Sequence, residues 1–222
     1  MSTPELWTRV DEYFSTHLLP DDPVLEEVLR TANDAALPAI AVSPNQGKLL
    51  EILVRLAGAR AVLEIGTLAG YSTICMARGL PPGGQLVTIE IDPRHAQVAA
   101  ANIASSGLGN VVELILGSAH DVLPRLVSQR AVFDFIFIDA DKQSIPQYFE
   151  RAMELSRPGS VIMVDNVVRD GKVIADDPDD AASAGVRKFV EMLSGYSAVS
   201  ATAIQMVGIK GYDGFALVRR HA

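Results

Sequence analysis

Residues 61–72 read Ala-Val-Leu-Glu-Ile-Gly-Thr-Leu-Ala-Gly-Tyr-Ser. Residues 61–65 form an apolar run interrupted by one acid, which has the length of a buried parallel strand. Gly66 and Gly70 then bracket a turn, and a helical pattern begins at Tyr71. Glycine suits a turn that needs a positive φ or a close approach to a ligand, and the first N–H groups of a helix are free to bind one. A strand, a glycine turn and a helix in this order predict a nucleotide-type site in an open α/β sheet.

The spacing of the glycines distinguishes between cofactors. A dinucleotide site is expected to show G-x-G-x-x-G, whereas Gly66 and Gly70 have G-x-x-x-G spacing, with Glu64 two residues before the first glycine. An acid at this strand end would repel a pyrophosphate, and it would attract the amino group and the sulfonium of S-adenosylmethionine. The turn therefore favours a methyltransferase, while a dinucleotide enzyme and a purely structural turn stay open at this point.

Composition limits the class of protein. The chain has 222 residues, of which 49% are hydrophobic, and a formal net charge of −8, so we expect one domain over residues 1–222. The acidic balance and the absence of a long basic run argue against nucleic acid as a partner. The sequence has no apolar run of membrane-spanning length and no signal-peptide pattern, which predicts a cytoplasmic protein without a membrane partner. The single cysteine, Cys75, is expected to be a buried structural thiol.

Strands and helices alternate after the glycine turn. Asp92 and Ser118 are expected to cap the helices that follow the second and third strands. Alternation of this kind predicts a mostly parallel sheet with right-handed crossovers and helices on both faces. The five strands of this part are predicted at residues 61–65, 86–91, 111–116, 133–138 and 160–164.

The C-terminal part departs from this alternation. Residues 203–209 and 214–218 predict two strands joined by a turn at 210–213, which makes a hairpin. A dinucleotide fold does not need such a hairpin, whereas the seven-stranded methyltransferase sheet has one. We therefore predict an α/β fold with a Rossmann-like, seven-stranded class I methyltransferase sheet that is mostly parallel and ends in an antiparallel hairpin.

Residues 1–42 precede the sheet. Residues 4–17 and 23–37 read as two amphipathic helices, and Ser43 with Pro44 is a typical start for a third helix. Because the first two helices lie outside the repeating unit of the sheet, we expect a helical cap over the substrate site or a dimer surface. Plain structural cover is the alternative.

Polar side chains follow the ends of three predicted strands. Glu90 ends the second strand, where an acid in a nucleotide-binding sheet hydrogen-bonds ribose hydroxyls. Asp139 follows the fourth strand, and Asp165 and Asn166 follow the fifth. Ligands bind at the carboxyl ends of strands in such sheets, and three oxygen ligands of this kind suit Mg²⁺. The alternative is that the acids cap helices and that Lys142 neutralises them.

Three motifs together carry a resemblance to a known family. They are residues 64–66 with 70–72, residues 139–142 (Asp-Ala-Asp-Lys) and residues 165–167 (Asp-Asn-Val). On these motifs the chain resembles the cation-dependent, S-adenosylmethionine-dependent O-methyltransferases. That family includes animal catechol O-methyltransferase, plant caffeoyl-CoA O-methyltransferases and bacterial relatives. The similarity covers roughly Val42 to the C-terminus.

The resemblance assigns roles to the matching positions. Lys142 would be the catalytic base, and Asp139 would also act in catalysis near the sulfonium. Ser118 and His120 would lie close to the adenine of the cofactor. The ligands of Mg²⁺, or of another divalent cation, would be Asp139, Asp165 and Asn166. The residues against S-adenosylmethionine would be Val42, Glu64, Gly66, Thr67, Gly70, Ser72, Glu90, Ala119 and Asp139.

The resemblance also implies the reaction. A methyl group would pass from S-adenosylmethionine to a hydroxyl of a catechol-like phenol or another small vicinal diol. The cation would lower the pKa of that hydroxyl, and Lys142 would take its proton. The family further implies a homodimer. A methyltransferase of the same fold acting on another acceptor, an NAD-dependent dehydrogenase and a catalytically silent scaffold remain as alternatives.

Two positions depart from the patterns of the family. The animal enzyme has a tryptophan at the position of Asp141, whereas the plant and bacterial relatives resemble this chain there. Arg169 stands where plant enzymes often have an aromatic residue. Both changes predict a more polar acceptor pocket.

Overall fold

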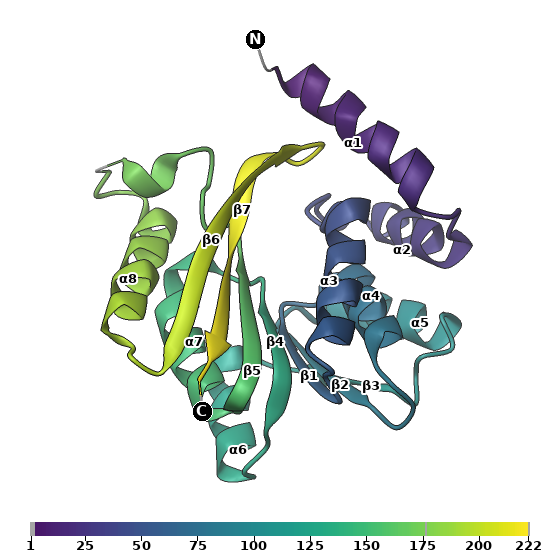
Figure 1. The fold of residues 1–222 in the computed structure, drawn as a ribbon. Helices are drawn as coiled ribbons and strands as arrows, with labels where there is room; N and C mark the ends of the chain where they lie inside the picture. Colours follow the sequence, from purple (N-terminus) through teal and green to yellow (C-terminus); the bar gives the residue numbers. More distant parts are fainter. Residues whose placement is uncertain (1–2, 176, 222) are drawn as a thin grey trace.

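Seven strands form one sheet in residues 3–175 and 177–221, the part of the chain that the computed structural model describes (Figure 1). Their order is β3-β2-β1-β4-β5-β7-β6. The first five strands in this order run parallel, whereas β7 is antiparallel to both β5 and β6. The predicted sheet with its C-terminal hairpin is confirmed. The strands are β1 (Ala61–Ile65), β2 (Gln85–Glu90), β3 (Val112–Leu116), β4 (Phe133–Ile138), β5 (Ser156–Asp165), β6 (Val199–Gly208) and β7 (Gly211–Arg220).

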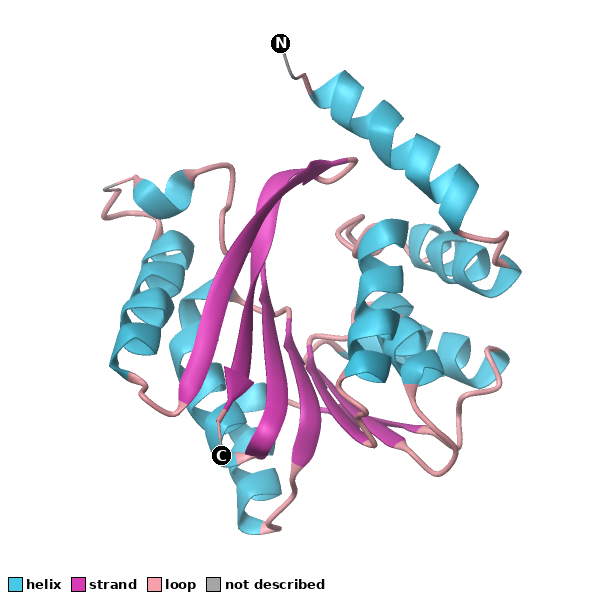
Figure 2. Ribbon diagram, viewed as in Figure 1, coloured by secondary structure: helices cyan, strands magenta, loops and turns pink. Residues whose placement is uncertain are grey.

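Helices cover both faces of the sheet (Figure 2), and their apolar side chains pack against it in two hydrophobic cores. One core joins the sheet to α6, α7 and α8 through Leu123, Phe149 and Phe189. The other joins it to α2, α3, α4 and α5, with Leu50 and Ile74 in its interior. None of the described helices is long and apolar enough to span a membrane. The helices are α1 (Pro4–Leu18), α2 (Pro23–Asp34), α3 (Pro44–Leu56), α4 (Tyr71–Gly79), α5 (Pro93–Ser105), α6 (Ala119–Ser128), α7 (Ile145–Glu154) and α8 (Ala181–Gly195), with short 3-10 helices η1 (Lys142–Ser144) and η2 (Lys172–Ile174).

The predicted helix starts are confirmed by their hydrogen bonds. The Ser43 hydroxyl accepts from the N–H of Gln46 at 3.2 Å, and Pro44 is the first residue of α3. Asp92 accepts from the N–H of Arg94 at 2.7 Å in the same way at α5. These side chains satisfy N–H groups that a helix cannot satisfy itself. Cys75 is buried in α4, and this burial raises the pKa of its thiol to about 12, as expected for a structural cysteine.

The C-terminal hairpin is longer than predicted. Its strands reach from 199 to 208 and from 211 to 220, so the predicted turn at 210–213 is wrong and the strands are joined at 209–210. Gly211 has a φ of 90°, which lets the chain reverse at this point. The first part of β6 was not predicted because this edge strand is mostly exposed and the apolar residues that alternate there, Val199, Ala201 and Ala203, are mostly small alanines.

Two other boundaries differ from the predictions by three residues or more. β5 begins at Ser156, although residues 156–159 read as a turn. The register between β4 and β5 shifts there, which indicates a bulge that accommodates Gly159 at a φ of 93°. α2 ends at Asp34 rather than at residue 37. No range was predicted for α7 and α8, which complete the helical cover of one face.

The carboxyl ends of β1 and β4 approach each other closely. The carbonyl oxygen of Ile65 accepts a hydrogen bond of 2.9 Å from the N–H of Asp139. Gly66 follows with a φ of 98°, and a Cβ atom at this position would lie 2.1 Å from the carbonyl oxygen of Asp139. Only glycine therefore fits at the end of β1, for reasons of backbone conformation and of space.

The replacement Gly66→Ala tests this constraint, with Gly159→Ala as its matched control. Gly159 has nearly the same φ, but its Cβ position is free of atoms within 4 Å. The control is expected to lose about 1–2 kcal/mol of unfolding free energy from φ strain alone. Gly66→Ala adds the backbone clash and should lose about 1–3 kcal/mol more. Urea denaturation of both variants measures the difference, and equal losses would contradict the steric argument.

Candidate active site

A cavity of about 640 Å³ opens at the carboxyl ends of the parallel strands, where ligands bind in open α/β sheets. Segments distant in sequence form its wall, namely the loop before α3, the turns after β1 to β5 and the β6–β7 turn. The structure therefore brings most of the predicted site residues together. Those in the cavity wall are Val42, Gly66, Thr67, Ser72, Glu90, Ala119, Asp139, Lys142, Asp165 and Asn166.

Glu90 shapes the glycine turn from the end of β2. Its Oε2 accepts from the N–H groups of Thr67 and Leu68, at 3.1 and 2.9 Å. Its Oε1 accepts from the N–H of Asp92 at 2.9 Å and lies 3.6 Å from Nδ1 of His95. Leu68 has a positive φ of 51°, an uncommon conformation. Glu90 therefore stabilises the turn and also presents its carboxylate to the cavity.

Glu64 lies behind the cavity wall rather than in it. The carboxylate is completely buried and accepts hydrogen bonds from the hydroxyls of Ser72 (2.5 Å), Thr73 and Thr88 (2.7 Å). Burial raises the pKa of Glu64 to about 7 in spite of these hydrogen bonds, and the negative charge of Asp139 contributes to the rise. Because Ser72 lines the cavity, Glu64 is one side chain away from anything bound there.

Asp139 and Lys142 form an ion pair after β4. Nζ of Lys142 donates to Oδ1 of Asp139 at 2.7 Å, and the Lys142 side chain is only 12% exposed. The backbone of Lys142 is supported by α8, since a Cβ atom on Gly185 would lie 2.3 Å from the Lys142 carbonyl oxygen. The ammonium group is therefore held in a fixed position at the cavity wall.

Asp165 and Asn166 end β5 on the same side of the cavity. Asp165 is 3% exposed and accepts from Nε2 of Gln46 at 2.8 Å and from the N–H of Asn166 at 2.9 Å. Burial raises the pKa of Asp165 to about 7, and the charge of Asp139 raises it further against the opposing effect of Lys142. Asn166 has a positive φ of 58°, a conformation that asparagine tolerates better than most residues. The arrangement of two mutually repelling carboxylates and an amide matches the ligands that Mg²⁺ takes.

Three further predicted positions lie close to the wall without being part of it, as far as the described residues show. Gly70 starts α4 with a φ of 89°. Ser118 caps α6 by accepting from the N–H of His120 at 3.2 Å. The His120 ring bonds Ser144 at 3.2 Å and lies 5.1 Å, centroid to centroid, from the ring of Tyr148, which does line the cavity.

The two departures from the family patterns have different positions. Asp141 lines the cavity and accepts from the Tyr148 hydroxyl at 2.6 Å, so this part of the wall is polar as expected. Arg169 instead bonds the Ser183 hydroxyl at 3.3 Å and lies outside the wall of this cavity. The expectation that Arg169 makes the pocket more polar is therefore wrong, because the side chain turns toward α8.

The wall residues that were not predicted from the sequence include four with polar groups, namely Gln46, His95, Tyr148 and Lys210. Gln46 follows a recognised N-cap, and a polar residue on an inward helix face is a signal that could have been used. Tyr148 lies in α7 and His95 in α5, the helices that follow β4 and β2. Aromatic and imidazole rings in such helices are also common as packing residues, so their presence alone does not indicate a site. Lys210 lies in the hairpin turn, and no local pattern connects that turn to the cavity.

The chain matches one family and close relatives along nearly all of its length. The model of the O-methyltransferase family matches residues 14–221. A catechol O-methyltransferase of Niastella koreensis is 50% identical over 214 residues, which cover 96% of this chain and 97% of the relative.

Solved structures show the same similarity. An O-methyltransferase of Bacillus cereus in complex with S-adenosylhomocysteine (SAH) has a TM-score of 0.97 and 52% identity, covering 98% of this chain and 100% of that one. An O-methyltransferase of Streptomyces achromogenes involved in tomaymycin synthesis, in complex with S-adenosylmethionine, has a TM-score of 0.95 and 49% identity over the full length of both chains. The chain belongs to the O-methyltransferase family, as an S-adenosylmethionine-dependent enzyme related to catechol O-methyltransferases.

Proposed function

We propose that the protein transfers the methyl group of S-adenosylmethionine to one hydroxyl of a small catechol-like phenol or vicinal diol, and that it needs a divalent cation. One observation carries this proposal. The cavity behind the glycine turn also contains Asp139, Asp165, Asn166 and Lys142. A methyl donor, a cation and a proton acceptor would thus act within one space.

The cation ligands in this proposal are Asp139, Asp165 and Asn166. In the described part of the chain, no three His, Cys, Asp or Glu side chains form a metal-binding group, so the proposed site needs the amide oxygen of Asn166 as its third ligand. A bound divalent cation would acidify one of two adjacent hydroxyls of the acceptor and fix both. Gln46 holds Asp165 from α3, which keeps one ligand in place.

Lys142 is the general base in this proposal. Its ammonium group lies 2.7 Å from Asp139 in the cavity wall, within reach of an acceptor hydroxyl bound there. Asp139 holds the amine beside the reacting hydroxyl. Positioning of this kind supplies much of the rate in transfers between two bound molecules.

The cofactor in this proposal lies along the glycine turn. Glu90 would hold its ribose, since this carboxylate faces the cavity at the end of β2. Asp139 at the wall and Glu64 behind Ser72 would balance the positive sulfonium. The remaining contacts would come from Val42, Gly66, Thr67, Gly70, Ser72 and Ala119.

The whole chain would act as one methyltransferase domain, with residues 1–42 as its cap. α1 has no buried residue among those described and exposes Leu6, Val10, Tyr13, Phe14 and Leu18. Apolar exposure along one helix is typical of a surface that another molecule covers. We infer that a second copy of the chain covers it in a homodimer, which sedimentation velocity tests.

Chelation tests the need for a cation. EDTA should abolish methylation of a catechol such as caffeic acid, and Mg²⁺ should restore it. Asp165→Asn should lose binding of Mn²⁺ in electron paramagnetic resonance titrations, because it removes one negative ligand, while SAH binding measured by calorimetry persists. The control Asp121→Asn, at an exposed position of α6, should bind Mn²⁺ normally. Activity that survives EDTA would sink the proposal.

Replacement of Lys142 tests the base. Lys142→Met should lower kcat by about 10²–10⁴ without weakening SAH binding. Lys142→Arg keeps a positive partner for Asp139, but a guanidinium does not give up its proton. If Lys142 is the base, arginine should therefore fail as badly as methionine. Recovery of kcat with arginine would instead show that only the ion pair matters.

The pKa of Glu64 predicts a pH dependence of cofactor binding. Below about pH 7 the buried carboxyl is protonated, so binding of the sulfonium must first displace that proton. Affinity for S-adenosylmethionine should rise with pH through this range and level off above pH 7. Affinity for SAH, which has no positive sulfur, should change much less.

Glu64→Gln is the matched variant for this prediction. It should remove the pH-dependent preference for S-adenosylmethionine over SAH in calorimetric titrations. If the pH-dependent preference for S-adenosylmethionine persists in the glutamine variant, Glu64 does not contribute to the discrimination between the charged sulfur of S-adenosylmethionine and the neutral sulfur of SAH.

A further inference from the structure

Lys210 brings a positive charge into the cavity wall from the tip of the β6–β7 hairpin. Its Nζ donates to the carbonyl oxygen of Ala39 at 3.2 Å. In residues 3–175 and 177–221, no carboxylate lies within 4.0 Å of this ammonium group, whereas Lys142 in the same wall is paired with Asp139. The cavity wall therefore contains one ammonium group, that of Lys210, which has no carboxylate partner in the described residues.

The order of the strands places Lys210 on the acceptor side of the cavity. β7 lies next to β5, which ends in Asp165 and Asn166. The residues expected to hold ribose and adenine, Glu90 and Ala119, follow β2 and β3 at the opposite side of the sheet order. An acceptor bound beside Asp165 would thus extend toward the hairpin tip.

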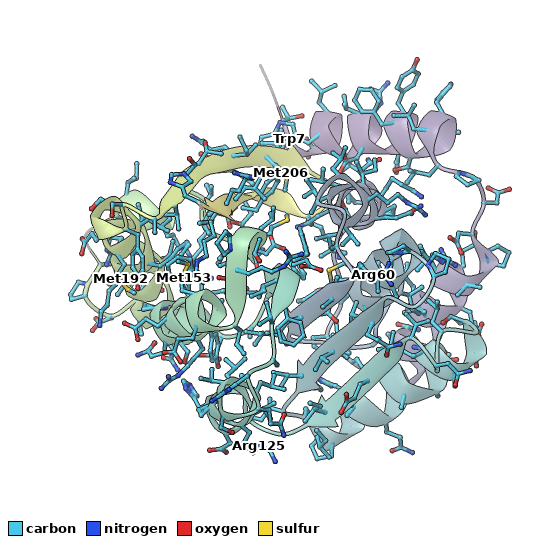
Figure 3. All side chains as sticks on the ribbon, turned by 60° about the horizontal axis from the view of Figure 1, so that its bottom comes forward. Trp7, Arg60, Arg125, Met153, Met192 and Met206 are labelled. Carbon is cyan, nitrogen blue, oxygen red and sulfur yellow. The ribbon has the colours of Figure 1, made fainter. Side chains whose placement is uncertain are left out.

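The tip is held in place by the N-terminal helices. Oδ2 of Asp11 in α1 accepts from the N–H of Ile209 at 2.9 Å. Asn45 at the start of α3 donates to Oδ1 of the same Asp11 at 3.2 Å. Figure 3 labels Trp7 of α1 and Met206 of β6 at this junction. Asp11 of α1, which is itself held by Asn45 of α3, therefore fixes the backbone beside Lys210 before any ligand binds, which lowers the entropic cost of using this lysine.

Lys210 is exposed as a whole residue, and partial desolvation of its ammonium group lowers its pKa without an opposing effect of an acidic neighbour. A partly desolvated ammonium group of this kind gains free energy when an anion binds. Carboxylate is the common anionic group of small phenols, and it would leave the adjacent hydroxyls free to face Asp165 and Lys142.

We propose that Lys210 binds a carboxylate group of the acceptor, so that aromatic vicinal diols with a carboxylate are preferred over neutral ones. This inference rests on the proposed function, because it takes the acceptor to lie between the cation ligands and the hairpin. Lys210 would be a specificity-determining residue and would take no part in the proton or methyl transfer.

A second source of carboxylate has to be distinguished. S-adenosylmethionine itself carries one, and Lys210 contacts Ala39, three residues before the expected cofactor residue Val42. If Lys210 binds the cofactor, its replacement should weaken SAH binding and leave the choice of acceptor unchanged. If it binds the acceptor, the reverse should hold.

The test compares equilibrium binding of two acceptors of the same shape to the full chain saturated with Mg²⁺ and SAH. The acceptors are 3,4-dihydroxybenzoate and the neutral 3,4-dihydroxybenzamide. The unmodified protein should bind the benzoate about tenfold more tightly, as a charge-assisted hydrogen bond predicts. Lys210→Gln should abolish that preference while its Kd for SAH stays unchanged. Lys188→Gln, which removes an exposed lysine on α8, should keep the preference.

Charge reversal makes the test independent of a general loss of binding. Lys210→Glu should prefer dopamine, which carries an ammonium group, over the benzoate, with the opposite order in the unmodified protein. Equal binding of benzoate and benzamide by the unmodified protein, or weaker SAH binding as the main effect of Lys210→Gln, would overturn the inference. A retained benzoate preference without methylation of any diol would sink only the proposed function, and binding of no diol at all would overturn both.

Discussion

The close approach of the β1 and β4 backbones is the constraint on which the rest of the site depends. Asp139 donates its N–H to Ile65, and its carbonyl oxygen occupies the space that a side chain on Gly66 would need. The glycine turn and the segment with Asp139 and Lys142 are therefore joined through main-chain atoms. Hydrogen bonding between neighbouring strand ends, rather than side-chain packing, sets the distance between the two halves of the cavity.

The charges around the cavity favour binding more than folding. Glu64 and Asp165 are both buried with raised pKa values, and Asp139 contributes to each rise. Acids placed in this way reduce the stability of the empty protein. A positive ligand would relieve that cost on binding, so the same side chains that weaken the fold would provide affinity for the sulfonium and the cation of the proposed function. Perturbed acids of this kind are common at functional sites.

Local patterns predicted the parts of the fold and site that are encoded locally. Strand ends at Glu90, Asp139 and Asp165 could be read directly because buried parallel strands are continuous apolar runs. Gln46 and Lys210 could not, because they reach the cavity from α3 and from a hairpin turn whose position depends on tertiary contacts. The first part of β6 was missed for a related reason, because its pairing with β7 maintains it while the apolar residues that alternate in it are mostly small alanines. The direction of the Arg169 side chain was predicted wrongly, because resemblance to a family indicates where the backbone lies and not where the side chain points.

The hydrogen bond between Gln46 and Asp165 connects residues 119 positions apart in the chain. The donor lies in α3 and the acceptor at the end of β5. The position of the Asp165 side chain therefore depends on how α3 docks on the sheet. A substitution that shifts this helix would disturb the end of β5 without altering any residue of the strand.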